Sequence, residues 1–346
     1  MLRSVFGAAE PELSPLDPEV AAQTAAVRAA IDPSRLRRSL ETLPAPRTRL
    51  LNPEAMASAD TLILDAFRSA GWPAELRAFE EPASDGAGGA PDLAPALRLS
   101  GVNVVAIKNG ESRDAVVVVA HHDTVPDTGG ADDNGSGVVA LLELARLLGS
   151  LRLRRSVVLA AVDHEELGFW GARRLVRELS AERRVVGAFV FEMLAYTDST
   201  PGSQKLPKGI GAVYRDQVRK VRARDFRGDF TAVIYRQSSR PLATCFAEGL
   251  NLLAGPAATI LLRAPSDLPV IGTVLARTLP FVRDFARSDH VAFWEAGLPA
   301  VQITDTANFR NPHYHRPSDT PETLDYGRLA DVIAAAAVAV ERVASR

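Results

Sequence analysis

The chain has very few cysteines, and this scarcity limits the chemistry available to it. Cys245 is the only cysteine among 346 residues. A single cysteine excludes an internal disulfide and removes the thiolates that usually hold structural zinc. Any metal site must therefore be built from histidine and carboxylate side chains.

The chain also lacks an excess of charge of either sign and a long apolar run. Forty basic residues face 42 acidic ones, for a net charge of -2, so no overall field favours nucleic acid or an anionic membrane surface. The longest apolar run, at 332–340, lies between Asp331 and Glu341 and is too short to span a bilayer. We expect neither nucleic acid nor a membrane as a partner.

The N-terminal sequence has no unbroken apolar stretch of the kind found in secretory signals, because Glu10 and Glu12 interrupt it. This predicts a cytoplasmic protein, or a secreted one if the sequence has been trimmed. Apolar residues make up 47% of the chain and charged residues 24%, as in ordinary globular proteins. Length alone allows one large or two smaller domains. We expect a single domain over 1–346 with a helical extension at 1–50, and an oligomer is possible.

Strands and helices alternate through most of the chain. Continuous apolar runs predict strands buried on both faces, and helical periodicity predicts the segments between them. This order predicts a three-layer α/β/α sandwich with a mixed, mostly parallel central sheet. The expected strands are 103–108, 115–120, 156–162, 185–191, 231–236, 258–263 and 299–304; the expected helices are 17–31, 33–42, 53–71, 136–149, 168–179, 240–254, 289–296 and 322–344, with a loop at 83–96.

The segment at about 197–228 interrupts this alternation, because it has no strong apolar period and many basic residues. One interpretation is a solvated surface loop with a short helix, as most charge runs are solvated. The other is an excursion over the site that borders a substrate cleft. The basic residues are Lys205, Lys208, Arg215, Arg219, Lys220, Arg222, Arg224 and Arg227.

Polar residues follow three of the predicted strands directly. His121 and Asp123 end the strand at 115–120, and Glu165 and Glu166 follow the strand at 156–162. Glu192 ends the strand at 185–191. In open sheets of this type, ligands bind beyond the carboxyl ends of the strands. Each motif alone could be a helix cap or a solvated carboxylate pair, but together they predict a site.

Two further segments complete the candidate site. The turn GGADDNGSG at 129–137 contains Asp132 and Asp133, and the segment after the last strand contains His313, Tyr314, His315 and Asp319. Two imidazoles and three carboxylates without thiolates suit zinc, with cobalt or manganese as substitutes. Of the adjacent glutamates, one can bind metal while the other addresses the attacking water.

These motifs, taken in order, resemble a known family. The pattern is His-x-Asp after a strand, G-A-D-D-N-x-S-G, E-E-x-G-x-x-G, a carboxylate-Met pair, S-D-H-x-x-F and Y-H-x-x-x-D-T, from about residue 101 to 326. It looks like the di-zinc metallopeptidase family twenty-eight. That family includes the bacterial leucyl aminopeptidases, aminopeptidases S and Y, glutamate carboxypeptidase and glutaminyl cyclase.

The resemblance implies a role for each motif residue. Asp133 would bridge two zinc ions, with His121 and Glu192 on one ion and Glu166 and His315 on the other. Glu165 would be the general acid and base. Many members carry Asp where this chain has Glu192, and the longer side chain can change the metal spacing. By the same resemblance, Asp123 would orient His121, Tyr314 would steady the oxyanion, and the bond between Asp133 and Asn134 would be cis.

The implied activity is a zinc exopeptidase acting on peptide or aminoacyl substrates through a hydroxide between the metals, most simply an aminopeptidase. A carboxypeptidase is an alternative, with the basic segment receiving a carboxylate. A glutaminyl cyclase would use one zinc, and the complete set of five ligands argues against it. A non-catalytic binding module would have lost ligands, whereas this chain retains them all.

Overall fold

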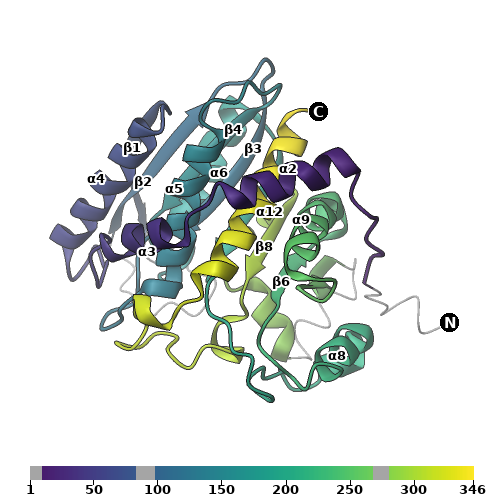
Figure 1. Ribbon diagram of the computed structural model, residues 1–346. Helices are drawn as coiled ribbons and strands as arrows, with labels where there is room; N and C mark the ends of the chain where they lie inside the picture. The colour runs from purple at the N-terminus through teal and green to yellow at the C-terminus, as the bar shows by residue number, and fades with distance from the viewer. Residues whose placement is uncertain (1–9, 83–97, 268–279) are drawn as a thin grey trace.

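A mixed sheet is the central layer of the computed structural model, which describes residues 10–82, 98–267 and 280–346 (Figure 1). In this part of the chain the sheet has eight strands in the order β1-β2-β4-β3-β5-β8-β6-β7. The strands are β1 Ala74–Pro82, β2 Arg98–Lys108, β3 Asp114–His121, β4 Ser156–Val162, β5 Arg184–Glu192, β6 Thr231–Tyr235, β7 Thr259–Arg263 and β8 Ala300–Thr304.

Four central strands run in parallel and determine where the site lies. β4, β3, β5 and β8 pair in parallel, so their carboxyl ends meet at one edge. On one side of these four strands, β2 pairs antiparallel with β4, and β1 pairs antiparallel with β2. On the other side, β6 pairs antiparallel with β8, and β7 pairs in parallel with β6. The predicted fold class, an α/β/α sandwich with a mostly parallel mixed sheet, is confirmed.

Helices cover both faces of the sheet. The core on one face joins the sheet to α3, α4, α5, α9 and α12, and the core on the other joins it to α6 and α11. α2 crosses the outer side of α12 (Figure 1). The helices are α2 Pro18–Ala29, α3 Pro33–Glu41, α4 Pro53–Ser69, α5 Gly137–Leu148, α6 Trp170–Glu182, α7 Ile210–Val213, α8 Arg215–Arg222, α9 Arg240–Ala254, α11 His290–Glu295 and α12 Tyr326–Ala344.

Several helix ends follow from local sequence. Asp32 caps α3 by accepting the backbone N–H of Ser34, and Asn52 caps α4 by accepting that of Ala55. A proline at the first helical position follows each cap, where its missing N–H costs nothing. None of the helices in the described ranges is long and apolar enough to cross a membrane.

Strand β1 is the main element that the sequence analysis did not predict. It is an edge strand in which exposed and partly buried residues predominate, so it has no apolar run. β2 also begins earlier than expected, at Arg98 rather than 103, because its first residues pair only with β1. The predicted loop at 83–96 lies outside the described residues.

The basic segment contains two short helices, α7 and α8. Ile210 of α7, Val221 of α8 and Tyr214 between the two helices are buried against the sheet, while several of the arginines pair with nearby acids. Arg219 pairs with Asp216 at 2.9 Å, for example. These helices therefore cover part of one sheet face and expose a charged outer surface.

Candidate metal centre and active site

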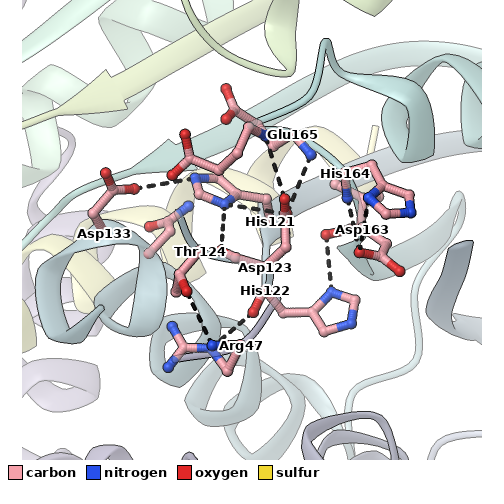
Figure 2. Close-up of polar contacts among 12 residues, drawn as sticks. Arg47, His121, His122, Asp123, Thr124, Asp133, Asp163, His164 and Glu165 are labelled. Carbon is pink, nitrogen blue, oxygen red and sulfur yellow. Dashed lines mark hydrogen bonds and ion pairs between the residues drawn. The ribbon is translucent and has the colours of Figure 1, made fainter. Parts of the chain in front are cut away.

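His121 is the last residue of β3 and points into the space between three carboxylates (Figure 2). Its Nε2 lies 3.4 Å from Asp133 Oδ1 and 3.5 Å from Glu192 Oε2. Its Nδ1 is 3.1 Å from the backbone oxygen of Asp123, a contact that fixes the plane of the ring. The imidazole is thereby held with Nε2 directed at the carboxylates.

His315 approaches Asp133 from the opposite side. Its Nε2 lies 3.1 Å from Asp133 Oδ2 and 3.4 Å from Glu166 Oε1. Each oxygen of Asp133 therefore faces one imidazole. The structure brings together all five residues that the sequence analysis expected to bind metal, in two groups that share Asp133.

Among the candidate ligands, His121 Nε2 and Glu166 Oε1 are buried and have no hydrogen-bond partner within the described part of the chain. An unpaired buried polar atom is costly, and like-charged carboxylates at close range repel one another. Ligand atoms of His121, Asp133 and Glu166 lie within 4.8 Å of one another, as do those of His121, Glu165 and Glu192. The residues present therefore fit a divalent cation.

The pKa values of the two histidines and of Asp133 reflect the crowding of charge. Burial would lower the pKa of His315, but the nearby carboxylates of Asp133 and Glu166 raise it to about 10. Burial opposes protonation of His121 too, yet Glu192 and Glu165 raise its pKa well above the usual value. The pKa of Asp133 is lowered, because the two imidazoles outweigh its burial. The carboxylates thus favour a positive charge between them.

Glu165 and Glu166 leave the end of β4 side by side but lie in different surroundings. Burial raises the pKa of Glu166 to about 7, assisted by Asp133 and opposed by His315. Burial also raises the pKa of Glu165 well above its usual value, with further contributions from Glu192 and Glu166 against His121. Glu165 is a buried carboxyl group with a high proton affinity beside the candidate metal site.

Asp123 joins the loops that carry His121 and the glutamate pair. Its carboxylate oxygens accept the backbone N–H groups of Glu165, at 3.1 Å, and Glu166, at 3.3 Å (Figure 2). The same carboxylate is 3.5 Å from His121 Nδ1, farther than the backbone oxygen. Asp123 therefore orients His121 chiefly through its carbonyl group and the glutamate loop through its side chain.

The loop that contains Asp133 is fixed from two sides. Asp319 accepts the backbone N–H groups of Asp132 at 2.9 Å and Asp133 at 3.1 Å. The Asn134 side chain bonds to the backbone of Phe191 and Met193, on either side of Glu192. The peptide bond between Asp133 and Asn134 is cis, as expected.

Tyr314 lies over the second group of ligands. Its ring stacks on that of His315, with centroids 3.8 Å apart, and its hydroxyl accepts a hydrogen bond from Arg287 at 3.2 Å. Burial, together with Asp133 and Glu166, raises the pKa of Tyr314, so the phenol keeps its proton. A protonated phenol at this position can donate to an oxygen that gains negative charge.

The S-D-H motif at 288–290 contributes groups beyond the five expected ligands. Ser288 Oγ donates to Glu192 Oε2 at 2.7 Å, and the carboxylate of Asp289 is fully buried without a hydrogen-bond partner among the described residues. His290 bonds instead to the backbone oxygen of Phe285 and packs edge-on against Trp294. The motif could have pointed to Ser288 from the sequence alone. The contact between Ser288 and Glu192 depends on tertiary structure.

The remaining histidines near the site have other partners. His122 points away from the carboxylates, with Nε2 2.8 Å from Asp60 and Nδ1 2.9 Å from the backbone oxygen of Val162. His164 contacts the backbone oxygen of Ser100, and His313 contacts Ser318. None of the three joins the two groups of candidate ligands.

Comparison with known proteins identifies the family. Residues 103–238 and 270–340, more than half of the chain, match the description Peptidase family M28. The chain belongs to peptidase family M28. It is therefore a peptidase that acts on peptide substrates, and the family together with the grouped ligands supports zinc as its metal.

Sequence relatives of this M28 peptidase include two with peptidase names. The uncharacterized protein YfbL of Escherichia coli is 35% identical over 243 residues, which cover 67% of this chain and 68% of YfbL. Aminopeptidase YwaD of Bacillus subtilis is 28% identical over 250 residues, 68% of this chain and 43% of YwaD. A probable zinc metalloprotease of Leptosphaeria maculans is 27% identical over 254 residues, 68% of this chain and 53% of that protein. The chain spans about half the length of the latter two.

Solved structures share the fold of the M28 peptidase. An aminopeptidase from Aneurinibacillus sp. strain AM-1 superposes with a TM-score of 0.67 at 16% identity, over 93% of this chain and 96% of that one. A glutaminyl cyclase from Porphyromonas gingivalis superposes with a TM-score of 0.60 at 17% identity, over 93% of this chain and 98% of that one. The fold is therefore common to both activities and does not separate them.

Arg47 supports the metal centre from a segment that lies before the residues matched to family M28. It is only 1% exposed, and its guanidinium donates to the backbone oxygens of His122 and Gly130 at 2.8 Å each and of Pro44 at 2.9 Å. Its backbone pairs with Thr124 (Figure 2). Gly130 has a φ of +60° and a Cβ there would lie 3.1 Å from Nη2, so the loop closes tightly around the guanidinium.

We expect Arg47→Met to weaken metal binding by about tenfold to a hundredfold, as other changes behind metal ligands do. The reason is that Arg47 joins the loop after His121 to the loop before Asp133. Zinc affinity would be measured by competition with a chromogenic chelator. Arg38→Met, at a side chain that is 66% exposed, is the matched control. Unchanged zinc affinity in a folded Arg47→Met protein would refute this role.

The ligand assignment predicts a loss of metal from two histidine variants. His121→Ala and His315→Ala should each contain less zinc than the unmodified chain by elemental analysis, because each removes one nitrogen from one group of ligands. His313→Ala is the matched control, since that imidazole bonds to Ser318 instead. Two zinc ions per chain in both His121→Ala and His315→Ala would show that the assignment is wrong.

Proposed function

We propose that this M28 peptidase is an aminopeptidase that binds two zinc ions. His121 and Glu192 would hold one ion, His315 and Glu166 the other, and Asp133 both. The observation that carries the proposal is the placement of the two Asp133 oxygens opposite the two imidazoles, with unpaired His121 Nε2 and Glu166 Oε1 beside them. Five ligand residues are more than the four that a tetrahedral zinc ion takes, which supports two ions rather than one.

Zinc in such a site polarises the scissile carbonyl and lowers the pKa of the attacking water. Glu165 takes the proton from that water at its carboxylate and returns it to the leaving amine. The buried environment that raises its proton affinity supports this role. Asp123 keeps the glutamate loop in place through the two backbone N–H groups.

Tyr314 stabilises the oxygen of the scissile carbonyl as negative charge develops on it. Its stacking on His315 fixes the ring, and Arg287 increases the ability of the hydroxyl to donate. Arg287 is itself held by Asn308 at 3.0 Å and Asp284 at 3.6 Å. The two side chains therefore form one preorganised donor group beside His315.

The charge around the site supports recognition of a free amine more than of a free carboxylate. Glu165 and Asp289, two buried carboxyl groups beside the site that are not assigned to the ions, favour an ammonium group when ionised. The carboxypeptidase alternative relied on the basic segment, but Arg219, Arg224 and Lys220 pair with acids on the surface. The aminopeptidase names of relatives agree with this preference.

The test compares two peptides of one sequence, one with a blocked amine and the other with a blocked carboxyl group. An aminopeptidase should cleave only the peptide with the free amine, which liquid chromatography would detect as release of the first residue. Cleavage of only the amine-blocked peptide would instead indicate a carboxypeptidase. Matched incubation of a peptide that begins with glutamine tests the glutaminyl cyclase alternative, since cyclisation retains the residue and releases ammonia.

A further inference from the structure

A cavity of about 120 Å³ opens beside the candidate active site, beneath helices α7 and α8. Glu192 and Tyr314 lie at the end near the metal centre. Strands β8, β6 and β7 provide the floor through the face that carries Gln302, Ala232 and Leu262. A substrate residue bound at the metal centre would have this cavity next to it.

The cavity has apolar walls from several separate segments. α7 and α8 contribute residues from one side, the sheet from another, and the segments at 280–286 and 307–309 from the rest. Such a space favours an apolar group of about the size of one benzene ring. The main apolar residues are Ile210, Val218, Ile234, Leu262, Phe285 and Phe309.

Gln302 is a polar exception on the cavity floor. Its side chain is 5% exposed, and its Oε1 has no hydrogen-bond partner anywhere in the described ranges. Buried amide oxygens are normally paired, so this acceptor is available to a ligand group that can donate. Neither helix above it nor the strands beside it supply that donor.

The position of Gln302 along β8 gives the depth of the acceptor. Thr304 pairs with Glu192 at the carboxyl end of the sheet, and Gln302, two residues earlier on the same face, pairs with Val190. Two residues of a strand span about 6.6 Å. Gln302 therefore lies one step farther from the carboxyl edge of the sheet than Thr304, in the inner part of the cavity.

We propose that this cavity binds the side chain of the substrate's N-terminal residue and that Gln302 selects side chains with an apolar ring and a hydrogen-bond donor at the tip, tyrosine foremost. The proposal rests on the aminopeptidase function. The tyrosine hydroxyl donates to Gln302 Oε1, and the ring contacts the apolar walls. Phenylalanine fills the same space but leaves Oε1 unpaired, so it binds less well.

The experiment compares kcat/KM for tyrosine and phenylalanine 4-nitroanilides in the zinc-loaded protein and in Gln302→Met. The unmodified protein should favour tyrosine by roughly tenfold, the range of one neutral hydrogen bond. Gln302→Met should reduce that ratio to about one or below, because the tyrosine hydroxyl loses its acceptor while the phenylalanine ring no longer faces an unpaired amide oxygen. Gln237→Met, at an exposed glutamine, is the matched control and should keep the original ratio. Hydrolysis of the phenylalanine substrate shows that Gln302→Met is folded. If Gln302→Met does not fold, Gln302→Leu takes its place.

Two outcomes would overturn the proposal: equal rates for the two substrates in the unmodified protein, or the same tyrosine preference after Gln302→Met. If neither substrate is cleaved, the aminopeptidase function has failed, and binding then tests the cavity separately. Calorimetry would measure L-tyrosinamide and L-phenylalaninamide affinities for the unmodified protein and Gln302→Met. Tighter tyrosinamide binding that disappears in the variant supports the role of Gln302, and equal binding refutes it.

Discussion

Glu165→Gln should reduce kcat by on the order of a hundredfold to ten-thousandfold while leaving the metal content unchanged. The amide cannot take a proton from the attacking water, but it keeps the shape of the buried side chain. Glu165 is 7% exposed and its loop is held by Asp123, so the substitution should leave the neighbouring ligands in place. Steady-state kinetics on an aminoacyl amide and elemental analysis of the same sample provide the two measurements.

Glu295→Gln is the matched control for this change, because that glutamate is 47% exposed and pairs with Arg173 on the surface. It should retain full activity. Full activity in Glu165→Gln would remove Glu165 from the proton transfer. Loss of both activity and zinc would instead make Glu165 a metal ligand, in agreement with its position near His121 and Glu192.

Removal of the metal should lower the melting temperature by on the order of 10 °C. Without a cation, the carboxylates of Asp133, Glu166 and Glu192 face one another across a buried space, and only protonated imidazoles offset their charge. A metal that binds the folded chain at concentrations far above its dissociation constant contributes several kcal/mol of stability. Differential scanning calorimetry before and after dialysis against a chelator would measure the shift.

The control restores zinc after chelation, which should return the melting temperature to its original value. His315→Ala should melt near the temperature of the chelated protein and respond less to added zinc, because one group of ligands is incomplete. An unchanged melting temperature after verified loss of metal would mean that the acidic cluster is stable without a cation and would count against the proposed centre.

Much of the candidate metal centre could be predicted from the sequence because its residues follow buried strands directly. His121, Glu166 and Glu192 each lie at or just beyond the end of a strand in one parallel set, and the carboxyl ends of such strands meet at one edge. Asp133 and His315 come from loops, and their motifs identified them through the family resemblance. Edge strand β1 was missed for the opposite reason, since its exposed residues have no apolar run.

Other important contacts join residues whose sequence positions give no sign of proximity. Arg47 reaches His122 and Gly130 across 75 and 83 positions, and Asp319 reaches Asp133 across 186. An arginine in a proline-rich segment normally reads as a surface residue. Its burial depends on how the N-terminal segment packs behind the sheet.

The sequence by itself determined the α/β fold class, the absence of thiolate ligands and the acids and imidazole at the strand ends, because apolar runs and the residues that end them are local features. Only the tertiary structure decided what lies beside that set. The side chain of Gln302 lies on one face of the sheet because successive residues of β8 point to opposite faces. Whether that face meets a helix or a cavity depends on α7 and α8, which lie 80 to 92 residues earlier in the chain. Long-range packing rather than local pattern therefore determines which side chains can reach a substrate.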